Sequence, residues 1–296
     1  MNIRNFLAEP GGFDSLKQFS THETPGVSGK DEAKEMMGNY IEKMQALQDK
    51  LYAENRYSLL LIFQAMDAAG KDSTIKHVMS GINPQGCQVY SFKQPSPEEL
   101  DHDYLWRTSR CLPERGRIGI FSRSYYEEVL IVKVHPVIIP GQKLPGIESV
   151  EKINPDFWNN RYESINDLEK HLTRNGTVVL KFFLNISREE QAERFLKRIN
   201  EPAKNWKFSF GDIGERKCWD ENQKAYETMI RNTSTENAPW YVIPADKKWY
   251  MRLAVSEIIL QRMESLGLKY PELSDKQKEE LIRGKQLLTE ELDQAS

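Results

Sequence analysis

The sequence predicts a doubly wound α/β fold with a mostly parallel sheet, on three observations. Short apolar runs alternate with helical patterns along most of the chain. The first run, YSLLLIFQ at 57–64, is almost continuously apolar, as in a strand buried on both faces. The intervening segments are long enough to cross over the sheet, and strand–helix–strand units of this kind place successive strands parallel.

The elements follow one another in a regular order. Residues 1–29 are rich in turn formers and are expected to form an extended arm. From Lys30, apolar residues recur three and four apart, which is typical of an amphipathic helix. Strands are then expected at 57–64, 87–92, 117–121, 177–186 and 240–244, and helices at 73–79, 97–112, 125–130, 155–174, 188–199, 212–232 and 248–266.

These elements indicate one α/β domain over 30–270, followed by a charged helical tail over 271–296. The chain has 296 residues, of which 39% are hydrophobic, so a large core can form. A net charge of −3 argues against general binding to nucleic acid or to an acidic membrane surface. The first residues lack the apolar stretch of a signal peptide, and the three cysteines are widely spaced, so a reducing cytoplasm is expected.

A phosphate-binding loop is predicted where the first apolar strand meets the next helix. In FQAMDAAGKDST, at 63–74, backbone N–H groups and a helix N-terminus would face an anion, and Lys71 would reach its terminal phosphates. Ala65 stands where the usual motif has its first glycine, and Asp72 stands where it has a magnesium-binding hydroxyl. The predicted phosphate-binding residues of this loop are Ala69, Gly70, Asp72, Ser73 and Thr74, and Asp67 is predicted to bind metal or act in catalysis.

The strand RIGIF at 117–121 is expected to end beside this loop. Its next residue, Ser122, occupies the position that usually supplies a magnesium-binding aspartate. Glu127 is therefore proposed as a second metal ligand and Glu128 as a catalytic carboxylate, although a Glu-Glu pair on a helix is more often a solvated face. Arg123 is predicted to act in catalysis, because charge at the carboxyl end of a parallel strand faces the site.

Two basic segments are candidates for binding a long anion. Residues 107–123 contain five arginines and a single acidic residue, and Arg107 and Arg110 are predicted phosphate ligands. The segment 188–215 resembles the mobile lid of nucleotide kinases, although its glutamates also fit an ordinary surface helix. The lid residues predicted to bind phosphate are Arg194, Lys197, Arg198, Lys204 and Lys207.

The five histidines show neither metal-ligand spacing nor an adjacent nucleophile. The chain also lacks a G-x-S-x-G elbow and a dinucleotide-binding glycine motif after a strand. Metallohydrolase, serine-hydrolase and dehydrogenase functions are therefore not indicated.

Four segments in order resemble the polyphosphate kinase 2 family: AMDAAGKDST, IFSRSYYEEVLIVKVHP at 120–136, SREEQAERFLKRINEPAKNWKFS at 187–209, and APWYVIPADKKWYMRLAV at 238–255. The resemblance implies a P-loop kinase fold with a helical lid. It also implies phosphoryl transfer between inorganic polyphosphate and AMP or ADP, and possible use of other nucleotides. Mg²⁺ is the implied metal, and Mn²⁺ is a possible substitute. The continuation EEVLIVKVHP is similar to the class III subgroup, which acts on both nucleoside mono- and diphosphates.

By position, Asp67, Gly70 and Lys71 match the family's phosphate loop, Arg123 matches the arginine that closes the strand before it, and 194–207 matches the lid. A cytoplasmic homo-oligomer is expected, with no nucleic-acid or membrane partner. Two alternatives stay open at this point. One is a nucleoside or nucleotide monophosphate kinase that uses ATP as its donor. The other is a non-catalytic protein that binds nucleotide or polyphosphate as a regulator.

Overall fold

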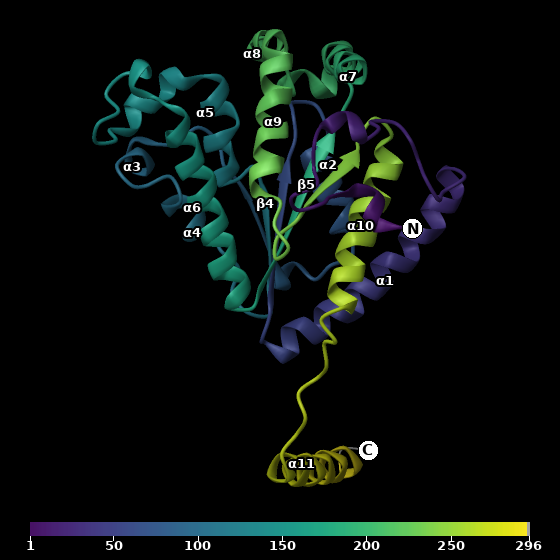
Figure 1. The fold of residues 1–296 in the computed structure, drawn as a ribbon. Coiled ribbons are helices and arrows are strands. Elements are labelled where there is room, and N and C mark those ends of the chain that lie inside the picture. Colours follow the sequence, from purple (N-terminus) through teal and green to yellow (C-terminus); the bar gives the residue numbers. More distant parts are fainter. Residues whose placement is uncertain (295–296) are drawn as a thin grey trace.

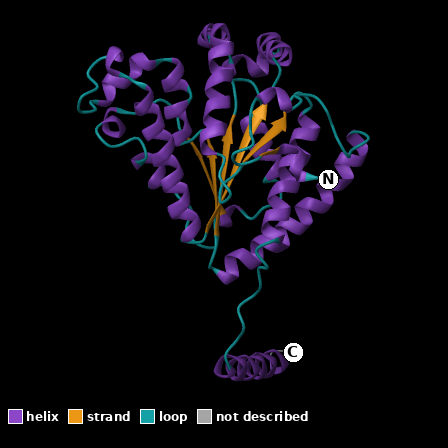
Figure 2. Ribbon diagram, in the orientation of Figure 1, coloured by secondary structure: helices purple, strands orange, loops and turns teal. Residues whose placement is uncertain are grey.

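The computed structural model describes residues 1–294 and shows the predicted α/β architecture (Figures 1 and 2). Within these residues a sheet has the strand order β1-β6-β5-β2-β4-β3. All neighbouring strands are parallel except β1 and β6, which are antiparallel. The strands are β1 (Leu7–Ala8), β2 (Ser58–Gln64), β3 (Cys87–Ser91), β4 (Ile118–Ser122), β5 (Thr177–Asn185) and β6 (Trp240–Pro244).

The helices cover both faces of the sheet, which confirms the doubly wound arrangement. Helices α1, α2 and α10 lie on one face, and α6 and α9 lie on the other (Figure 1). The helices are α1 (Lys30–Glu54), α2 (Lys71–Val78), α3 (Pro97–Leu100), α4 (Trp106–Ser109), α5 (Ile131–Val134), α6 (Pro155–Arg174), α7 (Arg188–Asn200), α8 (Phe210–Glu215), α9 (Trp219–Thr233), α10 (Lys248–Glu264) and α11 (Asp275–Gln294).

The centre of the sheet explains why its strands read as apolar runs. Every residue of β2 is buried, because β4 and β5 flank it and helices cover both of its faces. The chain leaves β2 toward β3 and β4 on one side and later returns to β5 and β6 on the other. Ligands of doubly wound sheets bind at the carboxyl end of such a reversal. The loop after β2 therefore begins where a site is expected.

Three helical predictions differ from the structure. The expected helix over 97–112 is two short helices, because Asp103 Oδ1 accepts the Leu105 amide at 2.9 Å and starts a new turn. The expected helix over 125–130 is the 3₁₀ helix η4 (Tyr125–Val129). The expected helix over 212–232 is divided into α8 and α9 by another 3₁₀ turn over 216–218.

The N-terminal arm packs against the domain rather than extending from it. Strand β1 adds to the edge of the sheet, and Phe6, Phe13 and Leu16 are buried in the core. Sheet pairing and apolar contacts, neither of which has a local pattern in this segment, fix its path.

The helical tail stands apart from the body of the molecule. An extended segment leads from α10 to α11, and α11 contains no buried residue over 275–294 (Figure 1). The last two residues of the predicted tail, 295–296, lie outside the described residues. Within residues 1–294, no helix is both long and apolar enough to cross a membrane.

Candidate active site

The phosphate loop, defined as residues 65–72, turns sharply from the end of β2 into α2. Gly70 caps α2 with a φ of +105°, a conformation that glycine adopts readily. A Cβ atom at this position would also lie 3.3 Å from Ser73 Oγ and 3.4 Å from Met251 Cε. Ala68 has a φ of +61°, so a second residue of the loop is left-handed. The tight turn brings the N-terminus of α2 to the carboxyl edge of the sheet.

Lys71, the first residue of α2, lies half-buried in this turn. Its Nζ donates a hydrogen bond to the Ala65 carbonyl at 2.6 Å. Burial lowers the pKa of Lys71, and the nearby Asp67 carboxylate opposes this effect. The ammonium is therefore held at the loop by a single carbonyl and by acidic neighbours.

Asp67, Arg123 and Glu127 come together beside Lys71, as the sequence predicted for residues at adjacent strand ends. Arg123 Nη2 lies 3.4 Å from Asp67 Oδ1, and the Arg123 amide donates to the Phe63 carbonyl at 3.1 Å. Burial raises the pKa of Glu127, although Arg123 and Lys71 partly oppose the shift. Arg123 has a φ of +68°, which is uncommon for a residue with a side chain and often marks functional sites.

The remaining polar residues of the loop are engaged with the protein. The hydroxyls of Ser73 and Thr74 donate to the Gly70 carbonyl at 2.9 and 3.0 Å. Ser122, in place of the usual aspartate, donates to Asp72 Oδ1 at 3.1 Å. Ser122 thus orients the carboxylate of Asp72, which is otherwise exposed at the mouth of the loop. Ala69 is buried and contributes backbone only.

Glu128 lies in a different environment from the one predicted for a catalytic carboxylate. It is buried, its Oε2 lies 3.5 Å from Arg161 Nη1, and it accepts a hydrogen bond from Gln142 Nε2 at 2.7 Å. Successive residues of η4 point in different directions, so Glu127 faces the loop while Glu128 faces Arg161. The structure therefore gives Glu128 an ion-pairing role at the wall of the neighbouring cavity.

A cationic groove of about 500 Å³ runs over the phosphate loop. Among the described residues that line it, nine side chains are cationic and three are carboxylates. The cations are Lys71, Lys93, Arg123, Arg194, Lys197, Arg198, Lys204, Lys207 and Lys248. Such an excess of positive charge suits a polyanion and is unusual in a chain with a net charge of −3.

Lys93 and Lys248 were missed by the sequence analysis. Each lysine lies shortly after the carboxyl end of a strand, at the edge of the sheet that faces the groove. This position in the sequence could have identified both as candidate phosphate ligands. Burial lowers the pKa of Lys248, and Arg194 and Lys197 add to this effect.

A second cavity of about 440 Å³ adjoins the groove. Its walls are largely apolar and include Phe92, Leu130 and Tyr226. Asp67 and Arg123 line both spaces, so the groove and the cavity meet at this ion pair. The cavity could not be predicted from the sequence, because its lining residues come from segments far apart in the chain.

The two arginines predicted to bind phosphate in the first basic segment do not lie at the same site. Arg107 lines the cavity, where Nη1 donates to the Lys93 carbonyl at 2.7 Å and the guanidinium lies over the Phe92 ring. Arg110 is exposed, and its guanidinium lies 4.6 Å from the centroid of the Trp106 ring, outside the residues that line the groove and the cavity. Arg107 lies within α4 and Arg110 follows its last residue, and the two side chains have different neighbours.

The predicted lid lies over the carboxyl end of the sheet and comprises α7, α8 and the 3₁₀ helix η7 (Pro202–Lys207) (Figure 1). Several of its cations are paired with lid carboxylates. Lys197 and Lys204 both pair with Glu201, and Arg198 lies 3.5 Å from Asp212. Lys207 lies over the exposed Trp206 ring. Arg194 differs from the prediction, because it is buried and does not share an exposed face with Lys197 and Arg198.

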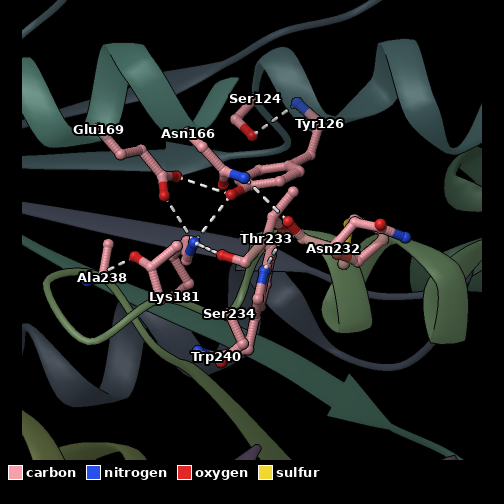
Figure 3. A network of polar contacts seen from close by, with 12 residues as sticks. Ser124, Tyr126, Asn166, Glu169, Lys181, Asn232, Thr233, Ser234, Ala238 and Trp240 are labelled. Carbon is pink, nitrogen blue, oxygen red and sulfur yellow. Dashed lines mark hydrogen bonds and ion pairs between the residues drawn. The ribbon is translucent and has the colours of Figure 1, made fainter. Parts of the chain in front are cut away.

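A buried polar network anchors the segment that follows Arg123 (Figure 3). Lys181 and Glu169 form a buried ion pair at 2.6 Å, and the hydroxyls of Tyr125 and Tyr126 donate to Glu169 Oε1. Lys181 Nζ also donates to the Thr233 carbonyl at 2.7 Å. Burial lowers the pKa of Lys181, opposed by Glu169, and burial raises the pKa of both tyrosines well above their usual value. The two tyrosines immediately precede Glu127, so the network fixes η4 beside the site.

Comparison with known proteins supports the assignment of the site. A family model described as Polyphosphate kinase 2 (PPK2) matches residues 27–270, which include the phosphate loop, Arg123 and the lid. The chain belongs to the polyphosphate kinase 2 family. Membership in this family makes it a phosphotransferase, which excludes the non-catalytic regulator left open by the sequence.

Several family members are similar over nearly their whole length. An ADP-polyphosphate phosphotransferase of Rhodopseudomonas palustris is 52% identical, covering 97% of this chain and 99% of that protein. An AMP/ADP-polyphosphate phosphotransferase of Meiothermus ruber is 42% identical, and the match covers 91% of this chain and 96% of that protein. The crystal structure of Polyphosphate Kinase 2 from Arthrobacter aurescens TC1 superimposes with a TM-score of 0.82 at 37% identity, covering 94% of this chain and 98% of that one. This polyphosphate kinase 2 chain therefore has the P-loop kinase-like fold of the family.

Replacing Asp67 by asparagine is expected to lower kcat at least about 10-fold, because the groove and the cavity meet at this carboxylate. The melting temperature should hold or rise slightly, since the negative charge near Glu127 is removed. Steady-state kinetics and thermal unfolding measure the two effects. Asp72→Asn is the matched control and should reduce kcat less, because Asp72 lies at the exposed mouth of the loop. Equal losses of stability and activity would show that Asp67 only forms the turn.

Proposed function

We propose that the protein transfers a phosphoryl group between inorganic polyphosphate and AMP or ADP, forming ADP or ATP. The observation that carries this proposal is the meeting of a cationic groove and a largely apolar cavity at Asp67 and Arg123. The groove suits a phosphate polymer, which presents charge along its whole length. The cavity suits a nucleoside, whose base and ribose need apolar walls and a few polar contacts. The relatives from Rhodopseudomonas and Meiothermus, named for these substrates, support the same assignment.

The chain's own residues can perform this transfer mainly by orienting phosphates and neutralising their charge. Lys71 and the N-terminus of α2 would hold the donor phosphates, and Arg123 would bridge donor and acceptor where the two spaces meet. The lid cations Lys197, Arg198 and Lys204 would hold the polymer along the groove. A lid over the site also excludes water, which would otherwise compete as an acceptor.

Mg²⁺ is proposed as the metal, and Mn²⁺ as a substitute. Within residues 1–294, no group of three or more His, Cys, Asp or Glu side chains is arranged to bind a metal ion. Mg²⁺ commonly binds one or two carboxylates and completes its shell with water and substrate phosphates, so Asp67 and Glu127 fit this mode. When bound, the metal would neutralise charge on the phosphates.

The decisive experiment incubates the pure protein with long-chain polyphosphate, Mg²⁺ and AMP, and separates the products by ion-exchange chromatography over time. ADP should appear first and ATP later, because the similarity to the Meiothermus relative, named for AMP and ADP, suggests both acceptors. A parallel reaction replaces polyphosphate by ATP. Turnover of AMP with ATP alone would favour the nucleotide monophosphate kinase, and a reaction that stops at ADP would limit the acceptor to AMP.

A further inference from the structure

Arg194 of α7 is a buried arginine with all five N–H donors engaged by the protein. Its Nε donates to Glu190 Oε1 at 2.6 Å. Its Nη1 donates to the carbonyls of Ala68 and Ala69 at 3.2 and 2.6 Å. Its Nη2 donates to the carbonyls of Ala245 and Asp246 at 2.6 and 3.0 Å. An arginine has five such donors and no acceptor, so no N–H group of Arg194 is left over for a phosphate oxygen.

The first two of these carbonyls belong to the phosphate loop. Carbonyl oxygens repel phosphate, so a loop that binds an anion must turn them away and present its N–H groups instead. The guanidinium gathers the carbonyls of Ala68 and Ala69 at the back of the loop, where Ala68 takes its left-handed φ of +61°. Its Nη1 lies so close under the turn that a Cβ added to Gly70 would be 3.6 Å from it.

The same helix holds a third carbonyl of the loop. Gln191, one turn before Arg194 and also buried, donates from Nε2 to the Asp67 carbonyl at 2.9 Å. Three successive loop carbonyls are thus bonded to one face of α7. The start of α7 is in turn tied to the end of β6, because the Ser187 amide donates to Asp246 Oδ1 at 2.8 Å.

We propose that Arg194 is a positioning residue, which fixes the phosphate loop against α7 and the end of β6, and that it is not a ligand of polyphosphate. This inference rests on the proposed function for the identity of the substrate, but not for the contacts themselves. Because α7 is the first helix of the lid, Arg194 also joins the lid to the loop that holds the donor.

The kinetic test compares Arg194→Lys and Arg194→Ala with Lys197→Ala and Arg198→Ala. Lysine keeps the charge but has three donors on one atom, so it cannot span the loop and β6. Both Arg194 variants should lower kcat at least about 10-fold, with an unchanged salt dependence of the KM for polyphosphate. Millimolar guanidinium should partly restore the kcat of Arg194→Ala. The two lid variants should instead raise that KM and flatten its salt dependence, because they remove a charge that salt screens.

A second readout does not depend on turnover. Hydrogen exchange followed by mass spectrometry should show faster exchange in peptides covering 66–71 and 245–247 for Arg194→Lys, and unchanged exchange there for Lys197→Ala. If the wild-type protein fails to use polyphosphate, the proposed function is wrong, and this measurement still judges the role of Arg194. If Arg194→Ala does not fold, Arg194→Lys and Gln191→Ala test the proposal instead. Gln191→Ala should lower kcat and speed hydrogen exchange in the loop, but less than Arg194→Lys does.

Two results would overturn the proposal. One is a wild-type kcat together with wild-type exchange in Arg194→Lys. The other is an effect of Arg194→Lys confined to the KM for polyphosphate with a flattened salt dependence, which would make Arg194 a substrate ligand like its neighbours on the lid.

Discussion

Replacing Lys71 by alanine is expected to lower kcat by a factor on the order of 10² or more while the fold stays intact. A preorganised charge acts mainly on the transition state, where negative charge on the transferring group must be stabilised. Lys71 lies at the start of α2 with its ammonium near Asp67, and its single hydrogen bond to the Ala65 carbonyl leaves donors available for phosphate. Initial rates with polyphosphate and ADP, with circular dichroism to check the fold, measure the effect.

The matched control is Lys76→Ala, on the same helix. Lys76 is exposed in the last turn of α2, away from the residues that line the groove. This variant removes the same charge and should keep a kcat close to that of the wild type. Near wild-type turnover in Lys71→Ala, or equal losses in the two variants, would contradict the role of Lys71.

Replacing Lys181 by methionine is expected to reduce the free energy of unfolding by about 3–5 kcal/mol, because it leaves the buried Glu169 carboxylate without its cation. This is a large part of the stability of an ordinary domain. Activity should also fall, since the hydroxyls of Tyr125 and Tyr126 hold η4 through the same carboxylate. Urea unfolding gives the stability, and kinetics below the transition give the activity.

Two further variants test the physical cause. The double variant Lys181→Met with Glu169→Gln removes the unpaired charge but keeps an oxygen that the tyrosines can reach, so it should recover part of the lost stability. The control variant Lys170→Met changes an exposed lysine of α6 that is next to Glu169 in the sequence. It should change the free energy of unfolding by less than about 0.5 kcal/mol. A Lys181→Met protein as stable as Lys170→Met would refute the account.

The strands and long helices could be predicted because their cause is local. Strands β2 and β5 are mostly apolar and almost wholly buried. Helices α6 and α10 begin and end within two residues of the expected positions, and α1 begins at Lys30 as expected. The segments that differed, over 97–112 and 212–232, are amphipathic in pattern but are divided by side-chain caps and 3₁₀ turns. The periodicity of apolar residues along the sequence does not reveal such interruptions.

The site was predictable to the extent that topology alone brings its residues together. Asp67, Lys71, Arg123 and Glu127 follow the ends of the adjacent strands β2 and β4, so a parallel sheet must place them side by side. The role of Arg194 was not predictable, because helical spacing places it near Lys197 and Arg198 but does not show that its side chain is buried. The partner of Glu128 was not predictable for the same reason, since its place in the helix does not show that its carboxylate faces Arg161.

For this protein, residue order is sufficient to establish the parallel sheet, the phosphate loop and the family, because each depends on short segments whose composition or spacing has a direct physical meaning. The tertiary structure alone decides which charges are free to meet a substrate. Lys181 and Arg194 are basic residues like Lys71, yet one is paired with Glu169 and the other is bonded to backbone carbonyls. Burial and bonding partners decide whether a charged side chain can bind a substrate. Both depend on residues that are distant in the sequence, because Arg194 and the phosphate loop are more than a hundred residues apart along the chain.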